Sequence, residues 1–326
     1  TSTFERKGRA ELTGWWSPDP SLRAMFTVRP DFSQVEADDV YQRINNRYPV
    51  YIAEKRPFFL DPNDPFRTHF RLVHTRSIVD PEVGLQFSGI WDRLGLFALG
   101  ALEKDTPSER FGGTDSQLRD TAWGVGAGRY EGAWGSFGLL GTSMDHGDMF
   151  NRVLSAEANP RFGNLDLGIQ VVQSWTRLQE AKVSTGYGVF FKAEQKVNRW
   201  LSVQVAHESL SRDFQALAGF MPEVGIHENS IASTFTYQPS SYDVLIKGYV
   251  LNARASRKLE QGGGLRQALL QLDQGLVLPG QLYVNLHGAW GSEVFAGIEF
   301  PLRDVSLSLG WWRHESLGLH GYVGRG

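Results

Sequence analysis

Strict alternation of apolar and polar residues is the feature that most constrains how this chain can fold. In the stretch NLDLGIQVV, Leu165, Leu167 and Ile169 alternate with polar or small residues, and the same period recurs in WLSVQVAHE at 200–208 and QLYVNLHGAW at 281–290. Successive side chains of a β-strand point to opposite faces of its sheet, so this period predicts strands with one apolar and one polar face. No helical pattern extends over a comparable length, and the chain is therefore predicted to be all-β.

Segments with this alternation follow one another along nearly the whole chain. They predict roughly 16–18 strands of about ten residues each. The short spacing between them fits an antiparallel, up-and-down order. The expected strands lie at 8–18, 21–31, 69–78, 82–91, 94–104, 118–130, 133–143, 149–159, 163–175, 184–196, 199–210, 228–238, 242–254, 265–277, 281–290, 293–301 and 304–313, with a shorter one at 317–324.

Two architectures bury one apolar face per strand. A soluble protein packs the apolar faces of its sheets together, whereas a transmembrane barrel turns them outward to lipid around a polar interior. Tight connections alternate with longer ones, and aromatic residues such as Trp91, Trp175 and Trp290 lie near strand ends, which favours the barrel. A large soluble β protein such as a propeller is the alternative. We expect one transmembrane, antiparallel up-and-down β-barrel domain over residues 1–326.

Charged residues on the predicted polar faces would line the interior of such a barrel. Both signs occur, so a pore lined by them would discriminate only weakly between anions and cations. The same charges could instead hold a segment that occupies the interior. The expected pore-lining residues are Arg23, Arg29, Asp166, Lys192, Glu194, Lys247, Asp273 and Glu299.

The segment 33–66, which contains the stretch AEKRPFFLDPND, does not alternate and is too long for a tight turn. Its prolines prevent a regular strand, its aromatic residues need burial, and its charges need water or acidic partners. Segment 33–66 is therefore expected to be a plug that folds back into the barrel, and a flap at the barrel mouth is the alternative. The rhythm of short and long connections places the segment on the periplasmic side, where the tight turns lie. The residues expected to hold the plug are Lys55, Arg56, Phe58, Phe59, Asp61 and Phe66.

A family resemblance supports this view of the chain. RPDFSQVEAD at 29–38 and EKRPFFLD at 54–61 resemble the paired signature of an uncharacterised bacterial outer-membrane barrel family. Members of that family commonly carry an N-terminal module like the family-9 carbohydrate-binding domains. SRDFQALAGFMPEVG at 211–225 and FTYQP at 235–239 resemble later motifs of the family in the same order. The resemblance implies a location in the outer membrane of a Gram-negative cell envelope and implies no established reaction.

Composition excludes several classes of function. The chain of 326 residues has 33 basic and 36 acidic residues, a net charge of −3, and this balance gives no basic footprint for nucleic acid. It contains 0 cysteines, so disulfides and thiolate chemistry are excluded. No stretch of about 18 apolar residues predicts a transmembrane helix. The histidines have no zinc-site spacing, and no cofactor or metal is expected.

The first functional hypothesis is a porin-like channel or transporter of the outer membrane, partly occluded by segment 33–66, with outer-membrane lipid as its surroundings. The second is a structural barrel that sheathes or anchors a protein partner in an envelope complex. A weaker third is a hydrolase that uses Asp145, His146 and Asp148 of the stretch TSMDHGDMF, expected on an outer loop. His207 is expected on the lipid-facing side near a strand end, with no partner evident in the sequence. No enzyme activity is predicted overall.

Overall fold

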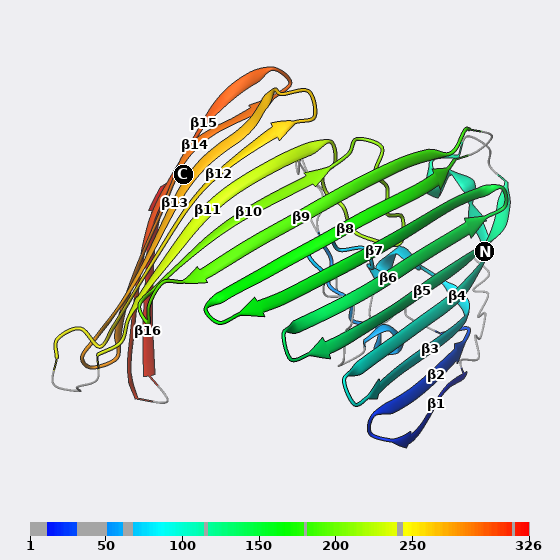
Figure 1. Cartoon of the computed structure of the whole chain (residues 1–326), viewed down its shortest axis with the longest axis horizontal. Coiled ribbons are helices and arrows are strands. Elements are labelled where there is room, and N and C mark those ends of the chain that lie inside the picture. Colours follow the sequence, from blue (N-terminus) through cyan, green and yellow to red (C-terminus); the bar gives the residue numbers. More distant parts are fainter. Residues whose placement is uncertain are drawn as a thin grey trace, which may run out of the picture. The chain divides into compact units, whose positions relative to one another are not determined.

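The computed structural model describes residues 12–30, 51–60, 68–113, 117–178, 181–239, 244–314 and 317–325. Within these residues 16 strands form one antiparallel sheet in chain order, each strand hydrogen-bonded to the next (Figure 1). The prediction of an all-β, up-and-down fold is confirmed, and the sheet is open, with β1 and β16 at its two ends. The strands are β1 (Leu12–Asp19), β2 (Leu22–Val28), β3 (Pro81–Trp91), β4 (Leu94–Pro107), β5 (Leu118–Gly132), β6 (Gly135–His146), β7 (Met149–Phe162), β8 (Leu165–Arg177), β9 (Ser184–Lys196), β10 (Leu201–Leu210), β11 (Ile226–Tyr237), β12 (Gly248–Glu260), β13 (Leu265–Leu278), β14 (Leu282–Phe295), β15 (Ile298–His314) and β16 (Leu317–Arg325).

Three of the expected strands differ clearly from the structure. Residues 69–78 do not join the sheet, and they contain the short 3₁₀ helix η2 (Thr75–Ser77). The segments expected at 293–301 and 304–313 are divided elsewhere, because the chain turns at Ala296 and Gly297, both with positive φ. Residues from Ile298 onward then run through Pro301 as the single strand β15.

Because residues 69–78 are not a strand, the insert lies at the opposite end of the sheet from the one expected. Segment 33–66 lies in the connection from β2 to β3, and this connection is at the same end as those after β4, β8 and β10. Those are longer connections, and most odd-numbered strands are followed by tight turns such as 92–93 and 163–164, although β6 and β14 are also followed by tight turns, at 147–148 and 296–297. The expectation that the insert leaves at the end with the tight turns is therefore wrong. The additional strand expected at 69–78 would have reversed the direction of every later strand relative to the first two.

The chain divides into two compact units, which we describe separately. The first unit comprises Thr1–Ala158, Gln170–Gly188 and Ser211–Val224. The second unit comprises Asn159–Ile169, Val189–Leu210 and Gly225–Gly326.

In the first unit a hydrophobic core lies on the face of the sheet that was expected to be polar, opposite the face with the exposed apolar side chains. Phe58 and Phe59, in the 3₁₀ helix η1 (Pro57–Phe59), belong to it together with Ile78. Gly84 of β3 makes room for the Phe58 ring, because a Cβ at this position would lie 2.7 Å from Phe58 Cε1. The other buried members are Met25, Phe97, Leu99, Ala101, Phe111, Trp123, Val125, Met144, Met149 and Ala218. In the second unit the only buried large apolar residues among those described are Leu210 and Ile226.

The opposite face of the strands carries large apolar side chains that are exposed in both units. Cross-strand pairs keep them in line, for example Phe26 with Leu85 in the first unit and Val205 with Ile231 in the second. Among the described residues, no helix has the length and apolar character needed to cross a bilayer. The exposed apolar residues include Phe26, Leu85, Leu96, Leu139, Leu154, Ile169, Val189, Val205, Ile231, Leu270, Leu286 and Leu307.

Candidate functional site

Residues 51–60 and 68–80, which we call the inner segment, lie against the first unit's sheet on the face opposite the exposed apolar one (Figure 1). Phe58 is 3% exposed and Phe59 is 7% exposed. Their rings meet edge to face at 5.0 Å between centroids, a favourable geometry for two aromatic rings. The inner segment is therefore attached to the sheet by close apolar packing as well as by its polar groups.

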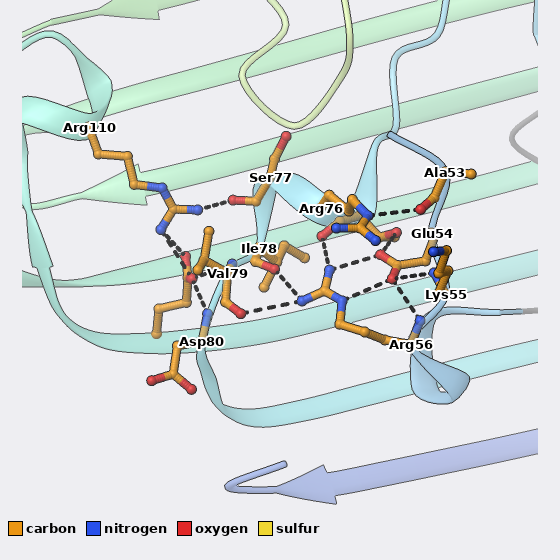
Figure 2. Close-up of polar contacts among 12 residues, drawn as sticks. Ala53, Glu54, Lys55, Arg56, Arg76, Ser77, Ile78, Val79, Asp80 and Arg110 are labelled. Atoms are coloured by element: carbon orange, nitrogen blue, oxygen red, sulfur yellow. Dashed lines mark hydrogen bonds and ion pairs between the residues drawn. The ribbon is translucent and has the colours of Figure 1, made fainter. Parts of the chain in front are cut away.

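Arg56 is almost fully buried, with 2% exposure, and it ties the two halves of the inner segment together. Its guanidinium forms a two-pronged ion pair with Glu54, with Nε 2.9 Å from Oε1 and Nη2 2.8 Å from Oε2 (Figure 2). The same guanidinium donates to the carbonyl oxygens of Ile78 at 2.7 Å and Thr75 at 2.8 Å. It also lies over the Phe59 ring, 4.3 Å from the centroid. The sequence predicted acidic partners for the charges of this segment, with interior charges of the barrel as candidates, and the carboxylate that pairs with Arg56 is Glu54 of the segment itself.

Glu54 receives hydrogen bonds from several directions. Its Oε1 accepts the backbone N–H groups of Lys55 and Arg56, and its Oε2 accepts the Thr75 hydroxyl at 2.6 Å. Burial alone would raise the pKa of Glu54, but hydrogen bonds from Arg56 and Thr75 and the charge of Arg56 lower it to about 2. Glu54 is therefore ionised over the whole physiological pH range.

Glu103 is the carboxylate of the sheet that fastens the inner segment. Its Oε1 accepts the backbone N–H groups of Val79 at 2.7 Å and Asp80 at 2.9 Å, and its Oε2 accepts the Trp123 indole N–H at 2.6 Å. Arg110 pairs with both carboxylate oxygens at 3.1 Å and also donates to the Ser77 carbonyl (Figure 2). Because Glu103 is only 2% exposed, these contacts form away from solvent and hold the inner segment close to β4.

The connection from β10 to β11 covers the same face and contacts the inner segment. The backbone N–H of His74 donates to the Ala218 carbonyl at 2.6 Å, and that of Phe220 donates to the Arg71 carbonyl at 2.8 Å. Asn151 of β7 fixes this connection by accepting the backbone N–H of Leu217 at 3.0 Å. The polar face of the first unit is thus covered by chain from both connections.

The remaining predicted plug residues are placed as follows. Lys55 is exposed, and Asp61 and Phe66 lie outside the described residues. The predicted plug contacts that the structure brings together are therefore those of Arg56, Phe58 and Phe59.

Six of the eight predicted pore-lining residues fall into three groups. Asp166, Lys192 and Glu194 lie on the polar side, where Asp166 pairs with Lys196 at 3.3 Å and Lys192 with Glu194 at 3.7 Å. Arg23 shares the face of buried Met25 and Thr27 in β2. Arg29 and Lys247 lie just outside β2 and β12, and Arg29 pairs with Glu82 at 2.6 Å.

Glu299 differs from its expected place. It pairs across the sheet with Val294 and lies on the same face as Val305, Leu307 and Leu309, all exposed apolar residues. This is the apolar face and not the polar one. Glu299 is tolerated there because it is the second residue of β15, next to the turn.

Asp273 lies on the polar face of the second unit, in a partly open cavity of about 650 Å³. Its Oδ1 is 2.6 Å from Nδ1 of His287, and Nε2 of His287 is 4.0 Å from Oδ2 of Asp304. Asn285 donates to Ser308 at 3.3 Å in the same cavity. His287 was not singled out from the sequence, although its place opposite Leu286 in the alternating stretch QLYVNLHGAW put it on the polar face.

The residues of the proposed hydrolase site are separated. Asp145 and His146 are consecutive in β6 and point to opposite faces of the sheet. Asp145 pairs with Arg152 at 2.5 Å, whereas His146 is fully buried between the hydroxyls of Ser108 at 3.0 Å and Thr121 at 2.8 Å. Asp148 pairs with Arg119 at 3.0 Å. The stretch is not an outer loop with a shared catalytic centre.

Across the described ranges, no group of three or more His, Cys, Asp or Glu side chains is arranged to hold a metal ion. No protein-family model, curated protein or solved structure matches the chain.

Proposed function

We propose that the protein is a β-barrel of the bacterial outer membrane that forms a channel partly blocked by its inner segment. The observation that carries the proposal is the exposed apolar face that the strands of each unit carry, which has no protein cover among the described residues. Exposed apolar surface of this extent requires an apolar partner, and the hydrocarbon of a bilayer is such a partner. In this proposal β1 and β16 pair to close the barrel, which leaves no free sheet edge in the membrane.

The opposite face fits the interior of a barrel. It carries charged and hydrogen-bonding side chains in mid-strand, including Lys192, Glu194, Asp273 and His287. Strands that alternate apolar-out and polar-in are typical of transmembrane barrels with a wet interior. The resemblance of RPDFSQVEAD and EKRPFFLD to an outer-membrane family is a further support.

The inner segment supplies the blockage in this proposal. It leaves the sheet at the end of the longer connections, and such connections are external in outer-membrane barrels. We therefore propose that the inner segment fills part of the barrel from its external end. Glu103 and Arg56 hold it in place through buried hydrogen bonds.

A planar-bilayer experiment tests the proposal. We expect the purified protein to insert into bilayers and to conduct weakly, and we expect a variant with residues 40–64 replaced by a short Gly/Ser bridge to conduct more. The full-length Glu103→Gln variant is the intermediate case, because it loosens the segment without removing it. Unchanged conductance in the shortened variant, with the barrel still folded, would contradict the plug.

A second candidate is a structural barrel that anchors a protein partner and conducts nothing. The dry packing of the first unit favours it, because Phe97, Leu99 and Trp123 are buried with Phe58 and leave little room for water. In this case neither the wild type nor the shortened variant conducts, and a stoichiometric partner copurifies in mild detergent.

A further inference from the structure

A shallow groove of about 490 Å³ lies on the apolar face of the second unit, across β9 to β12. Its apolar part is formed by Phe191, Val205, Ile231 and Ala255. Phe191, Val205 and Ile231 are 38%, 43% and 53% exposed, so the groove is open along its length. The small side chain of Ala255 lies directly beside Ile231 in the sheet and gives the groove its depth.

One end of the groove is polar. His207, Asn229 and Arg257 form a single cross-strand row on the same face, two residues beyond the row of Val205, Ile231 and Ala255. Adjacent rows of one face are about 7 Å apart, so the polar row directly borders the apolar part of the groove.

The polar row is rich in hydrogen-bond donors. Nδ1 of His207 lies 2.9 Å from Oδ1 of Asn229, a contact that leaves the amide N–H groups of Asn229 available. Arg257 is exposed and forms no ion pair or hydrogen bond with any residue that the structure describes. An unpaired guanidinium at the border of an apolar surface favours an anion, and its planar fork matches the oxygens of a phosphate.

The position of the polar row along the strands agrees with the binding of a phosphate. His207 precedes the end of β10 at Leu210 by three residues, which corresponds to about 10 Å along the strand. Beyond the apolar row of Val205, Ile231 and Ala255 comes a row of Val203, Ser233 and Ala253. The polar row therefore lies near the end of the strands, above a face that is mostly apolar. This is the level at which lipid headgroups meet the hydrocarbon of a bilayer.

We propose that the groove binds a phosphate-bearing membrane lipid. Arg257 and Asn229 bind the headgroup phosphate, and one acyl chain lies along Phe191, Val205, Ile231 and Ala255. The proposal rests on the proposed function, because it requires this face to lie in a membrane. A free phosphate would use only the polar end, and an apolar protein segment would use only the groove.

Lipid binding to the purified protein in a neutral detergent tests the proposal. The probes are dioleoyl phosphatidic acid, the matching dioleoyl glycerol and inorganic phosphate, with binding measured by native mass spectrometry and by the rise in melting temperature. We expect phosphatidic acid to bind and to raise the melting temperature, and we expect neither of the other probes to do so. Arg257→Gln should weaken phosphatidic acid binding about tenfold or more, as expected for losing a charged hydrogen-bond pair.

Two further variants give the experiment its controls. Arg303→Gln removes the same charge from an exposed arginine on the same face but outside the groove, and it should bind phosphatidic acid like the wild type. Ala255→Phe fills the groove without a change of charge, and it should lose phosphatidic acid while its melting temperature without lipid stays unchanged.

Three results would overturn the inference. Equal binding by Arg257→Gln and Arg303→Gln would show that general charge attracts the lipid. Equal binding of inorganic phosphate and phosphatidic acid would show that the groove plays no part. A protein that leaves the cell membrane without detergent would overturn the proposed function as well, whereas an embedded protein without phosphatidic acid selectivity overturns the lipid site alone.

Discussion

In each unit one face of the sheet lies opposite the exposed apolar side chains, and the two units differ in what covers this face. In the first unit this face carries Phe97, Leu99 and Trp123, and the inner segment buries it. In the second unit the corresponding positions form rows such as Asn252, Asp273 and His287, which stay open to solvent among the described residues. In the first unit the strands are apolar on both faces and the inner segment covers one of these faces, whereas in the second unit strict alternation goes with a polar face that is left uncovered among the described residues.

The same difference in burial determines how much an ion pair on this face contributes to stability in each unit. Glu103 binds its partners at 2% exposure, where an unmade hydrogen bond is costly. Glu228 of β11 pairs with Arg254 at 3.2 Å, and the two side chains are 24% and 48% exposed. Pairs of this second kind are screened by water and contribute little to stability.

The largest expected effect comes from emptying the apolar contact between segment and sheet. Phe58→Ala should lower the free energy of unfolding by about 3–5 kcal/mol, because it leaves a cavity against Gly84 and Phe59. Chemical unfolding in detergent measures it. The matched control is Phe235→Ala on the exposed face of the second unit, which should have a much smaller effect. Equal losses for the two variants would mean that the inner segment is not firmly packed.

Glu103→Gln should have the second-largest effect. It weakens charged hydrogen bonds to Val79, Asp80 and Arg110, and we expect a loss of about 1.5–3 kcal/mol by the same unfolding measurement. Glu228→Gln is its counterpart in the second unit and should cost only about 0–1 kcal/mol. If the second variant were as costly as the first, burial would not be what separates the two faces.

Much of the sheet could be predicted from the sequence, and the misplaced strand at 69–78 shows where the prediction fails. Phe70 and Leu72 alternate with Arg71 and Val73 as in a strand, and they are 3% and 0% exposed. The alternation is real, because this extended chain lies flat on the sheet and buries every second side chain. Its backbone bonds go to residues such as Ala218 in a distant connection, which no local pattern could reveal.

The candidate site was predictable in part for the same reason. The sequence indicated that Arg56 needs an acidic partner and that Phe58 and Phe59 need burial, but not that Glu54 would be that partner. Glu103 was missed, although a signal exists: it follows the apolar run LFALGAL, on the same face as Leu99. A carboxylate at the end of a run that is apolar on both faces indicates buried polar contacts.

Low pH should protonate Glu54 and so weaken the ion pair and hydrogen bonds that stabilise the inner segment. Its pKa of about 2 in the folded protein lies below the unfolded value of about 4.5, so its contribution to stability is complete above pH 4.5 and is lost as the pH falls towards 2. Melting temperatures measured between pH 6 and pH 2 should fall more steeply for the wild type than for Glu54→Gln. Parallel curves for the two proteins would show that Glu54 is not stabilised as an ion.

The smallest expected effect on stability concerns the open face of the second unit. Asp273 and His287 are 52% and 32% exposed, so a double-mutant cycle with Asp273→Asn and His287→Gln should give a coupling of only about 0–1 kcal/mol. The Asp273 carboxylate should affect ion selectivity more than it affects the free energy of unfolding. If the open face lines a water-filled path, Asp273→Asn removes a negative charge from that path, and the reversal potential in a salt gradient should shift towards anions. Glu299→Gln is the matched control, because it removes the same charge from the opposite, apolar face of the second unit. A coupling of several kcal/mol between Asp273 and His287, or an identical shift in both variants, would contradict the view that Asp273 lies on an open, water-filled face.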